Sequence, residues 1–339
     1  MIRFALFAGI AACLLLAFAC GGDPQPQPLS PAEQQNPELA QLNRLLAEDP
    51  SNDSLLHLRA EAYHDLEAFD EALRDLSAAI QQDSLQPRYY HLLADVLLDY
   101  ARPNDSKRAL DVLLTAAYLF PGRIQTLLKL SEIQLIVKQH GEALVTLDKI
   151  LKINPQHPEA FYMAGRVALD KGDTLSAIAS FRKSLQINAD NADGWRILGR
   201  IFINRNDPLA IQYLDNALRV DSTDLEAHEY KAMFYKYRGE FDKAFEIYRG
   251  IIVRNPDYSN AYFDMGAIYL ELDSLQKAYT HFDLAIKTDP LFVLAYHYRG
   301  VSLELMGDVE AAKKDYLRAN KMSPNHPDPK AALERLGVK

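Results

Sequence analysis

Histidines and carboxylates at helical spacing near the start of the chain are the first pattern that suggests chemistry. His57, Glu61 and His64 stand at i, i+4 and i+7, so they share one face of a helix. The spacing in sequence from His57 to His91 equals the spacing from Glu61 to Asp95. Imidazole nitrogens and carboxylate oxygens are ligands for zinc and similar metals. We expect a solvated polar surface rather than a metal site, and these five residues are the metal candidates.

Three arginines form a second pattern. Arg196 and Arg200 are four residues apart and share a helix face. The spacing in sequence from Arg166 to Arg200 equals that from His57 to His91. Together they would bind an acidic or phosphate-bearing segment, because an arginine fork holds both oxygens of a carboxylate. The alternative is that three nearby carboxylates neutralise the patch locally: Glu159, Asp170 and Asp193.

Catalytic motifs are absent from the sequence. It contains no G-x-S-x-G, no H-E-x-x-H, no Walker glycine loop and no G-x-G-x-x-G. A net charge of −9 argues against sequence-independent nucleic-acid binding, which needs a basic surface to displace counterions from phosphates. We therefore expect a protein that is not an enzyme, uses no cofactor and does not bind nucleic acid.

The segments that carry these residues repeat along the chain. Eight alanines fall in one nearly evenly spaced column: Ala72, Ala109, Ala143, Ala177, Ala210, Ala244, Ala278 and Ala312. A large apolar or aromatic residue stands four places after each alanine, and an upstream column holds only Ala, Ser or Gly. Coinciding columns with one constant period indicate a repeat architecture.

Each repeat predicts a pair of helices. In one repeat, Phe161 and Gly165 share a helical stripe, and Ala177 and Phe181 do the same in the next segment. A small residue at the crossing lets the two helices approach closely, while the large ring fills the space beside it. The Gly-Asp pair at 172–173 suits the turn, because glycine ends one helix and an acid favours the start of the next.

Polar or charged residues interrupt the apolar columns in three repeats. His228 and Lys231 stand where apolar residues are expected in the sixth repeat, and Arg59 and Arg299 do so in the first and the eighth. We expect looser packing at these three places.

The columns and their period resemble those of the tetratricopeptide repeat (TPR) family, whose unit is a short helix-turn-helix. The resemblance covers residues 53–326 and implies an all-α superhelical solenoid. It predicts about eight units: 53–86, 87–123, 124–157, 158–191, 192–224, 225–258, 259–292 and 293–326. Segments 37–52 and 327–339 are expected to form helices that cap the two ends of the stack.

The resemblance also implies a binding surface. In such solenoids the first helix of every unit lines a concave groove along which extended partners lie. The expected partner-binding residues belong to the first helices of the middle and later units: Tyr162, Arg166, Arg196, Arg200, Tyr230, Met233, Phe263 and Leu270. We expect the partners to be proteins or extended peptide segments, including acidic ones.

The N-terminus has the features of a secretory signal. Arg3 is followed by sixteen residues without a charged side chain, 4–19, and then by Cys20. The stretch 16–20, LAFAC, resembles a bacterial lipobox, in which a small residue precedes a cysteine that becomes lipidated. This resemblance implies that Cys20 carries lipid and is the first residue of the mature protein.

The predicted signal peptide therefore spans residues 1–19, and residues 20–36 form the lipidated cysteine with a Pro- and Gln-rich tether. Two alternatives remain. The stretch 10–13 also fits a lipobox, ending at Cys13, and the N-terminus can also remain as an uncleaved membrane anchor. All three tether the chain to a membrane.

These features predict a membrane-anchored TPR scaffold that mediates protein–protein interaction in the assembly or maintenance of a Gram-negative cell envelope. The expected location is the outer membrane, through the N-terminal lipid, on its periplasmic or surface face. Two other classes remain open: a dedicated pilotin-like or secretion-complex lipoprotein subunit, and a glycan- or metal-binding envelope protein.

Overall fold

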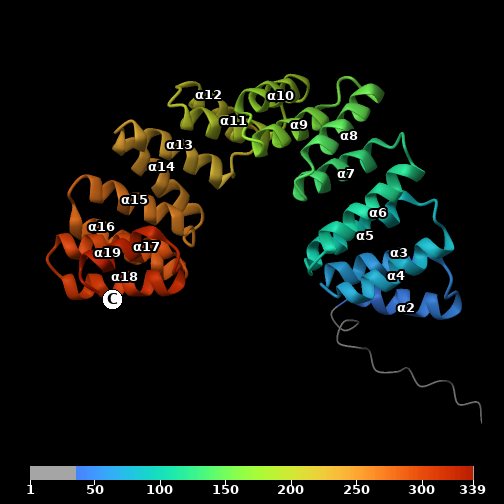
Figure 1. The fold of residues 1–339 in the computed structure, drawn as a ribbon, viewed down its shortest axis with the longest axis horizontal. Coiled ribbons are helices and arrows are strands. Elements are labelled where there is room, and N and C mark those ends of the chain that lie inside the picture. Colours follow the sequence, from blue (N-terminus) through green and yellow to red (C-terminus); the bar gives the residue numbers. More distant parts are fainter. Residues whose placement is uncertain (1–35, 339) are drawn as a thin grey trace, which may run out of the picture. The chain divides into compact units, whose positions relative to one another are not determined.

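The structure is a computed structural model that describes residues 36–338 (Figure 1). Within this range every regular element is an α-helix, and no strand occurs. The all-α class expected from the repeats is confirmed. No helix among these residues has the length and apolarity needed to span a bilayer.

The described residues divide into two compact units, 36–112 and 113–338, with the boundary inside α6. The first unit contains a lone helix and then paired helices: α2 (Pro37–Glu48), α3 (Asp53–Asp65), α4 (Phe69–Gln82), α5 (Pro87–Tyr100) and the start of α6 (Asp105–Leu119). We call the odd-numbered member of each pair the first helix and the even-numbered member the second helix.

The second unit continues the pairs after the end of α6. Its helices are α7 (Ile124–Ile136), α8 (His140–Ile153), α9 (Pro158–Asp170), α10 (Thr174–Ile187), α11 (Ala192–Asn204), α12 (Leu209–Val220), α13 (Leu225–Tyr237), α14 (Phe241–Arg254), α15 (Ser259–Glu271), α16 (Leu275–Thr288), α17 (Val293–Leu305), α18 (Val309–Met322) and the lone α19 (Pro327–Arg335).

The turn inside a pair has the same form with and without glycine. Gly172 follows α9 with φ of +80°, and the N–H of Asp173 bonds back to the carbonyl of Ala168 at 2.9 Å. Asp173 also caps α10, since its side chain accepts the N–H of Ser176 at 3.0 Å. In other pairs a non-glycine residue takes the positive φ, as Lys138 does at +62°. Glycine is therefore favoured but not required at this turn.

Close crossing of the paired helices explains the column of small residues. A Cβ added to Gly165 would meet ring atoms of Phe181 at 2.8 Å, and one added to Gly300 would meet Tyr316 at 2.7 Å. Phe181 and Tyr316 are fully buried. The large residue of the second helix therefore occupies the space that a side chain on the first helix would need.

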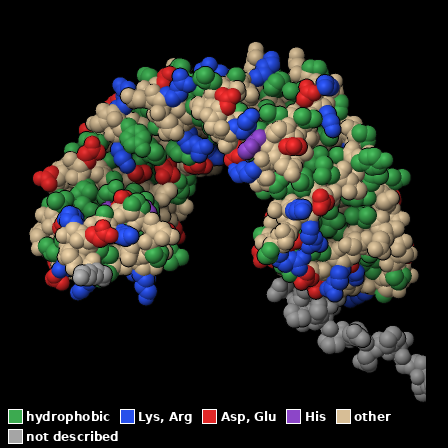
Figure 2. All heavy atoms as spheres, viewed as in Figure 1, with side chains coloured by type: hydrophobic (Ala, Val, Ile, Leu, Met, Phe, Trp, Pro, Cys, Tyr) green, Lys and Arg blue, Asp and Glu red, His purple; other side chains and the backbone are tan. Residues whose placement is uncertain are grey.

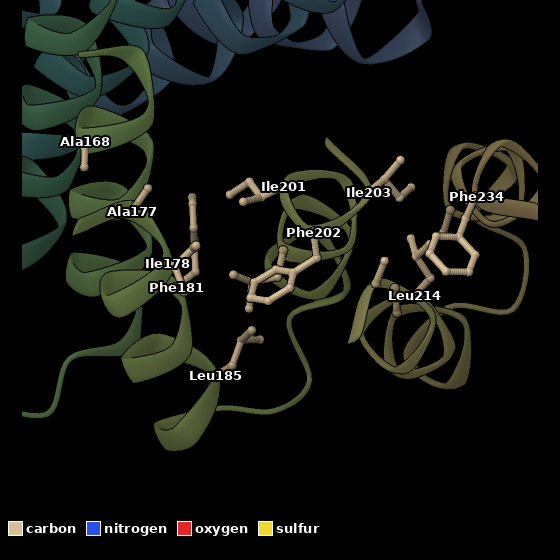
Figure 3. Close-up of a cluster of buried hydrophobic side chains, with 14 residues drawn as sticks. Ala168, Ala177, Ile178, Phe181, Leu185, Ile201, Phe202, Ile203, Leu214 and Phe234 are labelled. Atoms are coloured by element: carbon tan, nitrogen blue, oxygen red, sulfur yellow. The ribbon is translucent and has the colours of Figure 1, made fainter. Parts of the chain in front are cut away.

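A continuous apolar cluster joins neighbouring pairs in the second unit (Figure 3). Figure 3 shows Phe181 and Leu185 of α10 directed toward Phe202 of α11. Leu214 of α12 lies next to Phe234 of α13 in the same cluster. Because each pair buries its apolar face against the next pair, the first helices are held in a row.

The expectation of looser packing at the two arginines is wrong. Arg59 donates two hydrogen bonds to the buried Asp75, at 2.6 and 2.7 Å. Arg299 does the same to Asp315, at 2.8 and 2.7 Å, and also reaches Asp283 at 2.6 Å. Each arginine pairs with a carboxylate sixteen residues further along, on the second helix. Two-pronged ion pairs thus replace apolar contacts at these crossings.

Candidate functional site

One side of the first helices in the second unit, on which most side chains are half-buried, is the candidate site. Places equivalent to Tyr162, Arg166 and Leu169 recur in every first helix at about one repeat length. We call the side chains at these places the first-helix face, from α7 to α17: Leu128, Glu132, Leu135, Tyr162, Arg166, Leu169, Arg196, Arg200, Ile203, Glu229, Met233, Lys236, Phe263, Ala267, Leu270, His297, Val301 and Glu304.

Arg196 is neutralised by its surroundings. Its guanidinium lies 2.6 Å from Asp193, 2.8 Å from Asp224 and 3.3 Å from Glu226. Three carboxylates around one partly buried cation leave no free positive charge for a partner. Arg196 is thus paired with carboxylates of the protein itself.

Arg166 and Arg200 are less constrained. Arg166 makes one ion pair, with Glu132 of the preceding first helix at 3.3 Å, and both side chains are at least one-third exposed. Arg200 is exposed and lies against the hydroxyl of Tyr230. No carboxylate in residues 36–338 forms an ion pair with Arg200. The positive charges of these two arginines are therefore largely accessible to a ligand.

A hollow of about 480 Å³ brings these two arginines together. It spans three successive first helices, and its lining comes from the end of α7 and the turn after it, from α9 and from α11: Leu135, Ile136, Lys138, Arg166, Leu169, Asp170, Ile197 and Arg200. We call it the α7–α11 hollow. Figure 2 shows Lys and Arg side chains with a histidine over the region of α9 and α11.

Asp170 does not neutralise the arginines, because it has other partners. Lys138 lies 2.6 Å from one of its oxygens, and His140 lies 2.5 Å from the other. Hydrogen bonds from Lys138 and His140 hold the pKa of Asp170 below its usual range. Glu159 pairs instead with His157 at 3.1 Å. Of the three carboxylates considered from the sequence, Asp193 alone pairs with one of the arginines.

Glu229 is a residue of this face that sequence reasoning missed. The repeat before it is one residue short, so the place of Tyr162 is taken by Glu229 rather than Tyr230. The hydroxyl of Tyr258 donates to Glu229 at 2.5 Å, and burial raises the pKa of this carboxyl. Tyr230 instead donates to Glu226 at 2.7 Å. The small residue Ala232 marked the correct register, since it stands three places after Glu229.

The later residues of the predicted groove are only half exposed. Met233 and Leu270 are half-buried. Phe263 packs in an aromatic cluster, with ring centroids 5.0 Å from Phe292, 5.5 Å from Phe282 and 5.6 Å from Tyr298. Phe263 therefore contributes mainly to packing between α15 and its neighbours.

The five metal candidates of the first unit do not gather. Among residues 36–338, no group of three or more His, Cys, Asp and Glu side chains is placed to hold a metal ion. His57 is buried, which lowers its pKa, and its Nδ1 lies 3.7 Å from Glu61. His64 instead pairs with Asp99 at 2.7 Å. The remaining candidates are the buried His91 and the half-buried Asp95. Cys20, the expected lipid site, lies outside the described residues.

Comparison with known families agrees with the repeats. Two tetratricopeptide repeat models match the chain, one over residues 138–193 and 162–224 and the other over residues 294–326. The chain therefore carries tetratricopeptide repeats in its second unit, as the residue columns predicted.

Curated relatives match only part of their own length. The chain is 23% identical to tetratricopeptide repeat protein 6 of Homo sapiens over 240 residues, which cover 71% of this chain and 40% of that protein. The chain spans less than half the length of the curated relatives that it matches.

Solved structures support the fold. A tetratricopeptide repeat protein from Parabacteroides merdae is 20% identical, with a TM-score of 0.56 over 72% of this chain and 97% of that one. PilW, a widely conserved type IV pilus biogenesis factor, is 18% identical, with a TM-score of 0.54 over 62% of this chain and 98% of that one. These likenesses confirm the helix-turn-helix repeat fold.

Proposed function

We propose that this protein is a membrane-anchored tetratricopeptide scaffold that binds other proteins during assembly or maintenance of a Gram-negative cell envelope. The observation that supports it most is the α7–α11 hollow. Side chains from three successive repeats line it, so a ligand that fills it contacts all three. Extended polypeptides suit such a row, because successive side chains of the ligand reach successive repeats.

Attachment to the membrane rests on the lipobox-like sequence before Cys20. Acyl chains on this cysteine would hold the folded helices near the bilayer through the tether 21–36. Cys20→Ala should release the protein from the membrane fraction or stop its processing. If the variant stays in the membrane at the normal mature mass, lipidation at Cys20 is wrong, and Cys13→Ala then tests the other lipobox.

A dedicated role in one complex is the second candidate. The fold shared with the pilus biogenesis factor PilW supports this second candidate. A pilotin-like subunit would bind one partner in fixed stoichiometry, whereas a scaffold would bind several. A glycan-binding or metal-binding protein would bind its ligand when purified alone.

In-cell crosslinking separates these classes. The full chain would carry an affinity tag at its C-terminus, and the crosslinked proteins would be identified by mass spectrometry. We expect several envelope proteins, enriched over a control strain that carries an unrelated tagged lipoprotein. A single stoichiometric partner would support the dedicated-subunit alternative, and no enriched protein would contradict both protein-binding classes.

A further inference from the structure

The α7–α11 hollow carries more positive than negative charge. Lys138, Arg166 and Arg200 line it, and Asp170 is the one carboxylate in its lining. Asp170 is already bonded to Lys138 and to His140, so its charge is balanced before a ligand arrives. Arg166 and Arg200 remain as the cations that face a ligand.

Neither arginine is strongly held by the protein. The pair between Arg166 and Glu132 is exposed, and pairs of this kind contribute little to stability. Arg200 has no carboxylate partner within residues 36–338. A carboxylate that enters the hollow therefore gains charge-assisted hydrogen bonds without first breaking a strong ion pair.

Apolar side chains share the lining with the arginines. Ile136 is 47% exposed, and Leu169 and Ile197 are half-buried. Leu135 also lines the hollow and is almost fully buried. A ligand with an apolar group next to its carboxylate would cover Ile136 and make both kinds of contact.

We propose that the α7–α11 hollow binds an acidic stretch of an extended polypeptide, in which a Glu or Asp side chain is held by Arg166 and Arg200. An apolar side chain beside it packs on Ile136 and Leu169. This rests on the proposed function, because it assigns the partner chemistry of the same first-helix face.

A carboxylate ligand fits better than a nucleic acid. The chain has a net charge of −9, and Arg196, the next basic residue of the face, is surrounded by three carboxylates. A polyphosphate strand would meet this negative charge as soon as it extended past the hollow. A short acidic stretch with apolar residues matches the size and the lining of the hollow.

The probe is a fluorescein-labelled synthetic peptide in which Glu and Leu alternate, and its binding to the full chain is followed by fluorescence anisotropy. Matched peptides carry Gln in place of Glu or Ala in place of Leu, and inorganic phosphate serves as a competitor. We expect the Gln peptide to bind at least about tenfold more weakly and added salt to weaken the Glu peptide. We also expect the Ala peptide to bind more weakly.

Arg200→Glu should reduce binding of the Glu peptide by about tenfold to a hundredfold, and Arg200→Gln by less. Arg318→Glu, on the exposed side of α18, makes the same charge change away from the hollow and should leave binding unchanged. Circular dichroism would check that each variant keeps the helical content of the wild type.

Several results overturn the proposal. The first is that the Glu peptide does not bind the wild type at about 1 mM. The second is that the Glu and Gln peptides bind equally well. The third is that the Arg200→Glu variant binds the Glu peptide as the wild type does. Complete displacement by dilute phosphate would show an anion site rather than a polypeptide site. If the proposal fails while in-cell crosslinking still recovers partners, the scaffold function stands and uses another part of the face.

Discussion

Gly165→Ala should destabilise the α9–α10 pair, although alanine is the better helix former. In an exposed helix interior this change would stabilise the fold by about 1 kcal/mol. Here the new Cβ would lie 2.8 Å from ring atoms of Phe181, which is fully buried, so the ring or its helix must shift. Overpacking of a tight core costs about 1–3 kcal/mol. We therefore expect a net loss of up to about 2 kcal/mol.

Two further variants isolate the cause. Gly141→Ala lies in the first turn of α8 with no atom within 4 Å of the new Cβ, so it should not destabilise. Gly165→Ala combined with Phe181→Leu should lose less than the two single changes together. The first unit already pairs an alanine with a leucine at the same places, Ala60 and Leu76.

Urea unfolding followed by circular dichroism and by Trp195 fluorescence measures these effects. Trp195 is the single tryptophan of the chain and lies on α11, next to the changed pair, where it stacks on Tyr213. The reasoning about close crossing is refuted if Gly165→Ala is as stable as Gly141→Ala. It is also refuted if the double variant is no better than the sum of the single variants.

Two other predictions concern packing and acid sensitivity. Phe181→Ala should lower the free energy of unfolding by about 3–5 kcal/mol, because this ring is fully buried. Phe263→Ala should lower it by about 1–2 kcal/mol, because that ring is half exposed. Equal losses in urea unfolding would contradict the assigned faces. Hydrogen bonds from Arg335 on α19 lower the pKa of Glu304 on α17. The contact therefore stabilises the fold fully at a pH above the unfolded pKa of about 4.3. This stabilisation is lost as the pH falls through the lower pKa of the folded state. The difference in thermal midpoint between wild type and Glu304→Gln should therefore shrink below pH of about 4, and a constant difference from pH of about 6 to 3 would contradict this.

The helix pairs were predictable because their signal is local and periodic. The small residue at Gly165 and the large residue at Phe181 recur in every repeat, so several columns agree without knowledge of the structure. The face of each first helix follows from the same register. In the sixth repeat Glu229, rather than Tyr230, holds the place equivalent to Tyr162.

The ion pairs were not predictable from the same pattern. Arg196 reaches Asp224 at the end of its own repeat and Glu226 on the next repeat. Asp170 pairs with Lys138 and His140 and not with the arginines. Such contacts depend on side-chain rotamers and on the offset between neighbouring helices, which residue types do not specify. The arginine patch of the sequence is therefore reduced to two residues in the structure.

Site-specific crosslinking in the native cell tests the central claim most directly, which is that the first-helix face binds protein partners. A photoreactive amino acid would replace Tyr237, which follows Lys236 of the first-helix face at the end of α13 and is 62% exposed. In a second variant it would replace Val253, which lies near the end of the second helix α14 and is 82% exposed. We predict crosslinked partners from position 237 and few or none from position 253. Partners recovered only from position 253, or equally from both, would contradict the claim.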